Sequence, residues 1–225
     1  MADTARTRAI VLRRTNYGEA DRIVQLLTPE GKRSIIARGV RREKSKLAGG
    51  IELFAITDVT IHQGKGDMGV LTSARLVQFY RHILEDYDRL QFGYEVIKQV
   101  ARASEMVDEP EWYDVLAEVL AALDSRTLPR QLVETWFYLR HAALLGHELS
   151  FMHDVNGLPL LAGERYMYDV SEKGLRQAAN GELTTDHIKF LRLVSAKSLK
   201  VLAQIGGIDA ILPDCWLVAR QHAAI

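Results

Sequence analysis

The first 80 residues alternate between apolar and polar positions with a period of two, which predicts short β-strands. The alternation is clearest in the segment AITDVTIH at 55–62, where Thr57, Val59 and Ile61 share one face and residues 56, 58 and 60 share the other. Five segments have this character: 6–13, 22–27, 32–38, 51–62 and 69–77. Because turn residues separate them and no helix-length segment intervenes, they predict a small closed barrel of the OB-fold type.

After residue 79 the apolar positions recur with a period of 3.6, which predicts helices. Asp86 and Asp88 are both plausible caps for the first one. Helices are predicted at 84–106, 112–123, 129–146, 171–180, 185–194, 198–205 and 209–223. Glycine and proline break this pattern at about 147–170, where Tyr166, Tyr168 and Val170 alternate as in a short hairpin strand. The sequence therefore predicts an α+β protein with a barrel domain at 1–80 and a mostly helical domain at 81–225.

The composition is that of an ordinary globular protein, with 48% hydrophobic and 26% charged residues in a chain of 225. The apolar run near the N-terminus is too short for a signal-peptide core, and no window approaches the length of a membrane span. We therefore expect a soluble, cytoplasmic protein. Cys215 is the one cysteine of the sequence, so we expect a buried structural thiol and no intrachain disulfide or thiolate metal site.

Charge is strongly segregated, although the whole chain has 29 basic and 29 acidic residues. Residues 1–50 contain 12 Lys and Arg against 5 Asp and Glu, and the segment 32–46 contains seven cations and one anion, Glu43. Such a cluster can gain free energy by releasing counterions from a phosphate backbone. The cations expected to contact phosphate are Lys32, Arg33, Arg38, Arg41, Arg42, Lys44 and Lys46, with Arg13, Arg14 and Arg22 as further candidates. Charge alone leaves a merely solvated loop as an equal alternative.

Aromatic residues are scarce in the barrel segment, which contains Tyr17, Phe54, Phe79 and Tyr80. We expect Phe54 and Phe79 to lie in the core, whereas Tyr17 sits at a turn and could either stack on a base or cover the barrel end. Tight single-strand binding usually relies on exposed stacking rings. The pattern therefore predicts binding dominated by the backbone, with little sequence preference.

No catalytic motif is visible in the sequence. The segment GKGD at 64–67 lacks the residues of a phosphate-binding Walker loop and predicts a β-turn. Glu19 and Asp21 could share a strand face and hold a metal, but no third acidic ligand accompanies them, and a local ion pair with the basic strand is the favoured interpretation. His141 and His147 point to different helix faces, and no nucleophile elbow is present. We expect a non-catalytic protein with no cofactor and no metal.

Several motifs, taken in order, resemble the bacterial DNA repair and recombination mediator family RecO. They are YGEADRIV at 17–24, LTPEGK at 27–32, ARGVRR at 37–42, KSKL at 44–47, Phe54, GKGDMG at 64–69, LT at 71–72 and IKFLRL at 188–193. The resemblance spans the whole chain and is densest over residues 8–80. Many members of that family contain a four-cysteine zinc module between the helical segments. The segment at 147–170 contains no cysteine, so Gly157, Gly163 and the tyrosines are expected to close this hairpin without zinc.

The resemblance implies an OB-fold that binds single- and double-stranded DNA and anneals complementary strands. It also implies a mediator role in loading recombinase onto DNA coated with single-stranded DNA-binding protein (SSB), in the bacterial cytoplasm and in association with the nucleoid. The implied partners are the ring-forming protein RecR and the acidic C-terminal tail of SSB. The RecR contact surface has no local signature in the sequence.

A docking groove is one interpretation of the helical segment around residues 188–202. Its basic rim would comprise Lys189, Arg192, Lys197 and Lys200, and its floor Ile188, Leu191, Val194, Leu199 and Leu202. An ordinary amphipathic helix with its apolar face in the core is the competing interpretation. Two further alternatives for the whole protein are an OB-fold module that binds RNA and an interaction scaffold whose basic loop grips an acidic protein.

Overall fold

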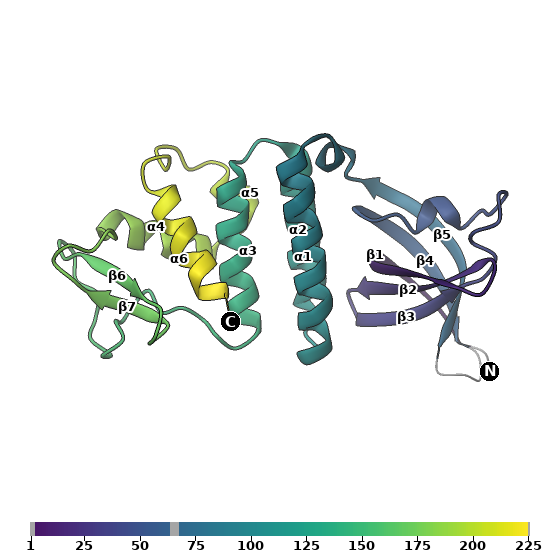
Figure 1. Ribbon diagram of the computed structural model, residues 1–225, viewed down its shortest axis with the longest axis horizontal. Helices are drawn as coiled ribbons and strands as arrows, with labels where there is room; N and C mark the ends of the chain where they lie inside the picture. Colours follow the sequence, from purple (N-terminus) through teal and green to yellow (C-terminus); the bar gives the residue numbers. More distant parts are fainter. Residues whose placement is uncertain (1–2, 64–67, 225) are drawn as a thin grey trace. The chain divides into compact units, whose positions relative to one another are not determined.

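A computed structural model of the chain describes residues 3–63 and 68–224 (Figure 1). The chain divides into two compact units, Met1–Asp124 and Ser125–Ile225, and each is described by itself below. The turn predicted at residues 64–67 lies outside the described residues.

Five strands of the first unit form a closed barrel in the order β1-β2-β3-β5-β4. Their bounds are Asp3–Tyr17, Asp21–Thr28, Gly31–Ala37, Ala55–Gln63 and Gly69–Phe79 for β1 to β5. All neighbouring pairs are antiparallel except β3 and β5, which run parallel. The predicted five-stranded OB-type barrel is therefore confirmed. Strand β4 begins four residues later than predicted because Phe54 takes a φ of 56°, which interrupts the extended backbone.

The barrel interior follows the predicted alternation. In β4 the side chains of Thr57, Val59 and Ile61 are buried, and those at 56, 58 and 60 are half-buried. The interior cluster comprises Ala9, Val11, Val24, Leu26, Ile35, Ala37, Val40, Ile51, Val59, Ile61 and Leu71. Each large aliphatic side chain buried in this way contributes about 1.5–3 kcal/mol. In β4 the alternating sequence therefore decides which face turns inward, whereas in β1 four consecutive residues, 9–12, are buried.

Two helices, α1 (Tyr87–Met106) and α2 (Glu111–Ser125), follow the barrel and a short 3-10 helix, η2 (Arg81–Glu85). Asp86 is the N-cap of α1, because its Oδ1 accepts a hydrogen bond from the Arg89 backbone N–H at 3.1 Å. Gly93 of α1 lies against the Phe54 ring, so close that an added Cβ would stand 2.8 Å from Phe54 Cε1. This glycine allows α1 to pack on the barrel segment.

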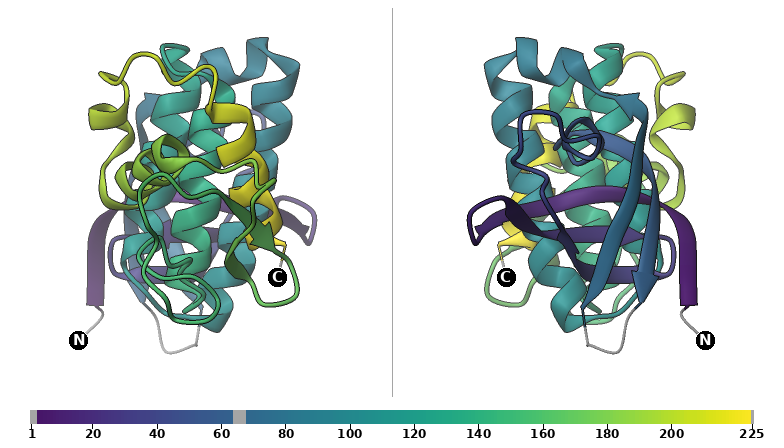
Figure 2. Two further views of the ribbon diagram at one scale, coloured as in Figure 1. Left: turned by 90° about the vertical axis from the view of Figure 1, so that its left-hand side faces the viewer. Right: turned by 90° about the vertical axis from the view of Figure 1, so that its right-hand side faces the viewer.

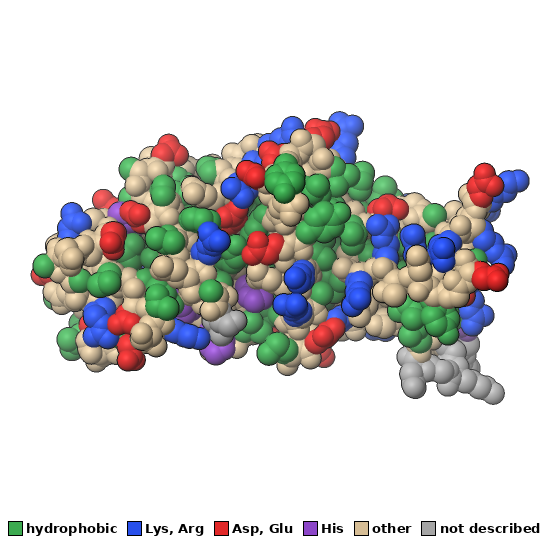
Figure 3. Space-filling model, in the orientation of Figure 1, with side chains coloured by type: hydrophobic (Ala, Val, Ile, Leu, Met, Phe, Trp, Pro, Cys, Tyr) green, Lys and Arg blue, Asp and Glu red, His purple; other side chains and the backbone are tan. Residues whose placement is uncertain are grey.

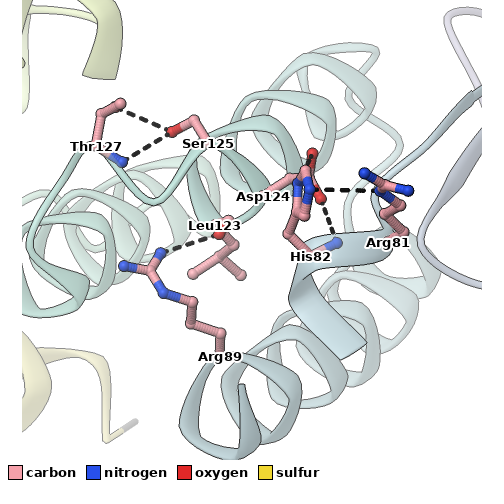
Figure 4. Close-up of polar contacts among 7 residues, drawn as sticks. All are labelled: Arg81, His82, Arg89, Leu123, Asp124, Ser125 and Thr127. Atoms are coloured by element: carbon pink, nitrogen blue, oxygen red, sulfur yellow. Dashed lines mark hydrogen bonds and ion pairs between the residues drawn. The ribbon is translucent and has the colours of Figure 1, made fainter. Parts of the chain in front are cut away.

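The C-terminal end of α2 is tied back to η2 and α1 by polar contacts (Figure 4). Asp124 accepts a hydrogen bond from the His82 backbone N–H at 2.8 Å, and Arg89 Nη1 donates to the Leu123 carbonyl at 2.9 Å. These bonds help to explain why α1 and α2 group with the barrel, although the periodicity changes near residue 80. A barrel domain that ends at residue 80 remains a proposal.

The second unit contains four helices and a two-stranded sheet among its described residues. The elements are α3 (Arg130–Leu144), β6 (Tyr166–Asp169), β7 (Gly174–Gln177), α4 (Thr185–Ala196), α5 (Leu199–Leu202) and α6 (Leu212–Ala223). The helix predicted at 171–180 is wrong, because this segment makes a turn and then β7. Lys173 takes a positive φ of 52°, and Gly174 lies where an added Cβ would stand 2.7 Å from Val155 Cγ1. The positive φ of Lys173 is incompatible with a continuous helix.

Polar side chains stabilise the cysteine-free segment that precedes and includes this hairpin. The Tyr166 hydroxyl accepts a hydrogen bond from the Leu161 N–H at 2.8 Å, and the Tyr168 hydroxyl lies 2.9 Å from His222 Nδ1. Gly157 and Gly163 take positive φ values of 77° and 88° at its turns. Within residues 3–63 and 68–224 no group of three or more His, Cys, Asp or Glu could hold a metal ion.

Cys215 in α6 is fully buried, and burial raises the pKa of its thiol to about 12. The thiol therefore stays protonated and packs as a small apolar group, as predicted. None of the helices in the described residues combines the length and the apolar character that a membrane crossing requires.

Candidate nucleic-acid interface

The turn between β1 and β2 and the segment between β3 and β4 meet at one end of the barrel. The Gly39 N–H donates to Asp21 Oδ1 at 2.7 Å, and the Arg41 N–H donates to the Ala20 carbonyl at 2.9 Å. Arg41 Nη1 also donates to the Gly18 carbonyl at 3.3 Å. The right-hand view of Figure 2 shows this part of the chain in front of the strands. The β3–β4 segment is thus docked on the neighbouring turn.

Five cations project from this docked segment, which we call the basic loop, residues 38–46. Its backbone is folded into turns, with the Arg42 N–H bonded to the Gly39 carbonyl at 3.1 Å and the Ser45 N–H to the Arg42 carbonyl at 3.0 Å. The five exposed cations are Arg38, Arg41, Arg42, Lys44 and Lys46. Glu43 is the one acidic residue in this range. Lys and Arg side chains gather around the barrel loops on the face drawn in Figure 3.

Buried apolar residues anchor the segment on either side of the cations. Val40 and Ile51 both belong to the barrel core. Gly50, in the 3-10 helix η1 (Ala48–Gly50), lies so close to β5 that an added Cβ would stand 2.5 Å from the Ala74 carbonyl oxygen. The cations therefore extend from a backbone that the barrel holds in place.

Two further candidates lie at the same end of the barrel. Arg22 pairs with Ala37 in the β2–β3 register, beside the start of the basic loop, and its Nε donates to Asn16 Oδ1 at 3.2 Å. Arg14 forms an ion pair with Glu52 at 2.8 Å, and its Nη1 also donates to the Ile51 carbonyl at 3.3 Å. Arg14 thus holds the end of the β3–β4 segment, whereas Arg22 borders the basic loop.

Lys32, Arg33 and Arg13 lie apart from the basic loop. Lys32 Nζ donates to the Ala101 carbonyl at 3.0 Å and forms an ion pair with Glu105 of α1, with only 13% of its side chain exposed. Arg33 is the next residue along β3, and Arg13 pairs with Gln25 of β2, which in turn pairs with Ser34 of β3. Because a strand rises about 3.3 Å per residue, Lys32 and Arg38 lie about 20 Å apart. The single stripe expected from Lys32 to Lys46 is therefore divided between the two ends of β3.

The aromatic side chains follow the expectations only in part. Phe54 is buried, as predicted, whereas Phe79 is 36% exposed, so its expected place in the core is wrong. Phe79 is the last residue of β5, whose side chains from Thr72 onward are mostly exposed. Tyr17 is 55% exposed at the end of β1, next to the turn that the basic loop contacts.

Of the two carboxylates considered as metal ligands, Asp21 has a local structural role, and the structure shows no role for Glu19. Asp21 accepts the Gly39 N–H and so positions the start of the basic loop. The ion pair with the basic strand that the sequence favours is therefore wrong for Asp21, because the donor is a backbone amide. Glu19 is exposed in the turn itself.

The apolar floor expected for a docking groove in the second unit is wrong. Ile188, Leu191, Val194, Leu199 and Leu202 are all buried and therefore belong to the core. Of the four rim cations, Lys189 pairs with Asp186 at 3.7 Å, whereas Lys197 and Lys200 are exposed.

Arg192 instead borders a different cavity, of about 500 Å3, with Leu149, Phe151 and Met152. Its Nε donates to the Phe151 carbonyl at 2.8 Å. Arg140, a neighbour that the sequence pattern did not single out, lines a smaller cavity, and its guanidinium carbon lies 5.6 Å from the centroid of the Trp136 ring. The spacing of α3 offered no signal for it, because Arg140 lies within an otherwise regular apolar pattern.

Comparison with known proteins relates the chain to one family. Residues 1–80 match the family model described as "Recombination protein O N terminal". The chain is 32% identical to "DNA repair protein RecO" of Dehalococcoides mccartyi over 96% of its own length and 88% of that protein. It is 34% identical to "DNA repair protein RecO" of Roseiflexus sp. over 53% of its own length, a match that spans 42% of that relative. The chain therefore belongs to the RecO family of DNA repair proteins.

Proposed function

We propose that the chain binds single- and double-stranded DNA through the basic loop and acts in DNA repair and recombination without catalysis. The observation that carries this proposal is the docked segment at 38–46, with five exposed cations and one anion on an anchored backbone. Arg22 extends this surface along the end of β2. Arg13, Arg14, Lys32 and Arg33 are less suited to phosphate contact, because they lie apart from the loop or have bonded side chains.

The chemistry of this surface suits contact with the phosphate backbone. Arginine and lysine gain free energy by displacing condensed counterions, and this gain is independent of sequence. Tyr17 is an exposed ring next to the turn that the loop contacts, and aromatic residues are scarce in the barrel segment, so few bases could be held by stacking. Bases that are not held by the protein remain free to pair with a second strand, which supports a role in annealing.

Family membership supports a wider role as a recombination mediator. In this proposal the protein helps to load recombinase onto DNA coated with SSB, in association with RecR, in the bacterial cytoplasm near the nucleoid. We place the acidic SSB tail on the second unit, near Lys189, Arg192, Lys197 and Lys200. The cavity of about 500 Å3 beside Arg192 supports this placement, since it combines a cation with the apolar side chains of Phe151 and Met152. Glu148 also lines it, so the carboxylates of the tail would have to meet Arg192 and the exposed lysines.

The central experiment is fluorescence-anisotropy binding of labelled single-stranded DNA across a salt series. Five phosphate contacts predict a slope of log K against log salt of about −3 to −4. Replacing Arg38, Arg41, Arg42 and Lys44 together with Ala should reduce the slope to about −1 and weaken binding on the order of 100-fold. An unchanged slope in a folded variant would show that DNA binds elsewhere.

A variant with Lys189, Arg192, Lys197 and Lys200 changed to Ala is the matched control, because it removes the same number of positive charges. It should retain DNA affinity and lose affinity for a peptide with the acidic SSB tail, whereas the basic-loop variant should retain the peptide. Retention of the peptide by the control variant would reject this site for the tail.

Two competition experiments separate the alternatives. Single-stranded RNA of equal length should compete weakly with DNA, and equal competition would favour a general nucleic-acid module. If instead an acidic protein partner displaced DNA from the basic loop, the scaffold interpretation would be preferred.

A further inference from the structure

The outer face of β1, β4 and β5 has a second group of arginines that the proposed function does not use. The pairing of these strands places Arg8, Asp58 and Arg75 in one row across the sheet. The adjacent row contains Arg6, Thr60 and Ser73. Because alternate residues of a strand face the same side, both rows lie on the outside of the barrel, opposite the buried Val59 and Ile61.

Asp58 orients Arg8 and Arg75 and leaves most of their N–H donors available for other partners. Its Oδ2 lies 2.7 Å from Arg75 Nη2, and its Oδ1 lies 3.6 Å from Arg8 Nε. The side chains of Arg75 and Arg8 are still 79% and 64% exposed. A guanidinium has five N–H donors, so several remain available on each. The exposed Arg6 side chain makes no hydrogen bond or ion pair within the described part of the chain.

These residues line an open cavity of about 630 Å3 whose chemistry suits phosphate. Three arginines and the hydroxyl residues Thr7, Thr60 and Ser73 contribute to its walls, and Asp58 is the one carboxylate of its lining. The Thr7 hydroxyl donates to Glu30 Oε2 at 2.9 Å, which leaves Thr60 and Ser73 as the available hydroxyls. Arginine and hydroxyl side chains are the usual donors to phosphate oxygens in DNA complexes. Arg6 and Arg8 lie two strand positions apart, about 7 Å. This spacing suits successive phosphates of one strand better than a single small anion.

We propose that this outer face is a second phosphodiester-binding surface, which accepts a separate segment of single-stranded nucleic acid. Arg6, Arg8 and Arg75 donate to phosphate oxygens, Thr60 and Ser73 add hydroxyl contacts, and Asp58 keeps two of the guanidinium groups in position.

The two basic surfaces are separated along the long strand β1, whereas on β5 Arg75 follows Ala74, which Gly50 at the end of the β3–β4 segment approaches closely. Arg8 is nine residues from Tyr17, beside the basic loop, which corresponds to about 30 Å along an extended strand. One chain can thus hold two strands at once, which would raise their local concentration for pairing. This consequence for annealing rests on the proposed binding of DNA at the basic loop. The proposal of the second surface does not depend on that binding.

The test measures how many short oligonucleotides one chain binds. Native mass spectrometry and anisotropy at low salt would use oligothymidylate of about ten nucleotides, within the usual site size of one OB-fold. We expect two bound per chain for the wild type and one for the variant with Arg6→Ser and Arg75→Ser. The second binding event should weaken by about tenfold or more, and its salt slope should fall by about 1.4 for two lost phosphate contacts. Lys98→Ser with Arg102→Ser, two exposed cations on α1, is the charge-matched control and should still bind two.

Asp58→Asn provides a test in the opposite direction. It removes the carboxylate from the cavity and should strengthen the second binding event without altering the first. One oligonucleotide per wild-type chain, or two for the Arg6 and Arg75 variant, would overturn the inference. It would also be overturned if an acidic peptide occupied this face and oligothymidylate did not. If the basic-loop variant keeps its tighter site while the Arg6 and Arg75 variant loses one site, the proposed function fails and this inference stands.

Discussion

Lys32 and the basic loop belong to one run of cations in the sequence, but they end up in opposite physical situations. Lys32 lies at the start of β3, where α1 covers it and only 13% of its side chain is exposed. Arg38 and the cations that follow it lie beyond the other end of the strand and are exposed. Lys32 and the basic loop therefore do not form one surface although they are close in sequence, because the two ends of β3 lie about 20 Å apart.

The two ends also use positive charge differently. The Lys32 ammonium donates to a carbonyl and a carboxylate of α1, so its charge stabilises the packing of a helix on the barrel. The cations of the basic loop are exposed, and within residues 3–63 and 68–224 Arg41 alone among them has a bonded side chain, which donates to the Gly18 carbonyl. Exposed cations add little to folding stability, but they can release counterions when a polyanion binds.

The sharpest test of this contrast removes two cations from each end of β3. Changing Arg38 and Arg42 to Ala should weaken single-stranded DNA binding by about tenfold or more and reduce the salt slope by about 1.4. Changing Lys32 to Met and Arg33 to Ala should alter the affinity by less than about twofold, because neither side chain belongs to the loop surface. Anisotropy titrations of both variants at equal salt would measure the difference.

Circular dichroism and thermal unfolding are the controls for both variants, since affinity is comparable only between folded proteins. Equal losses of DNA affinity in the two variants would show that both ends of β3 bind DNA. The cations from Lys32 to Lys46 would then form one continuous basic surface.

The second prediction concerns stability at the covered end. Lys32→Met keeps the apolar part of the side chain and removes two hydrogen bonds to α1, so the free energy of unfolding should fall by about 1–2 kcal/mol. Arg38→Met at the exposed end is the matched control and should change it by less than about 0.5 kcal/mol. Urea denaturation would measure both values. A larger effect of Arg38→Met would mean that the loop cations support the fold.

The third prediction concerns how Asp21 holds the basic loop. Asp21→Asn keeps an oxygen that can accept the Gly39 N–H and removes a negative charge, so DNA affinity should stay equal or rise slightly. Asp21→Ala removes the acceptor as well, and the freed loop must then be ordered on binding, which should weaken binding several-fold relative to Asp21→Asn at a cost of about 1 kcal/mol. Anisotropy titration of the two variants isolates the hydrogen bond from the charge. Equal affinities would show that the docked conformation does not matter.

The sequence predicted the five strands, the inward faces of β4 and the burial of Cys215, because each depends on local periodicity or on apolar character. It did not predict that Lys32 would be covered, since that depends on α1, which lies about 70 residues later in the chain. The strand at Gly174–Gln177 was missed for a related reason, because it is formed by pairing with Tyr166–Asp169, and the pattern of one segment does not show such pairing. The arginines at 6, 8 and 75 lie close together because of the register between strands. The pattern within a single segment does not reveal this register.

The smallest expected effect is a pH dependence confined to the covered end. The hydrogen bond and charge of Lys32 hold the pKa of Glu105 below its ordinary value of 4.5. A carboxyl group with a lowered pKa in the folded state contributes stability above pH 4.5, and this contribution is lost as the pH falls through the folded pKa. The difference in unfolding free energy between wild type and Lys32→Met should therefore shrink below pH 4.5.

That difference should not vanish, because the bond from Lys32 to the Ala101 carbonyl does not titrate in this range. Glu105→Gln should abolish the pH-dependent part, and Arg38→Met should leave it intact, since Arg38 lies at the other end of β3. Urea denaturation at a series of pH values between about 3 and 7 would measure it. A pH-dependent part that persisted in Glu105→Gln would assign it to another carboxylate. If the pH-dependent part disappeared in Arg38→Met, the two ends of β3 would interact electrostatically. The contrast between a structural end and a binding end would then be wrong.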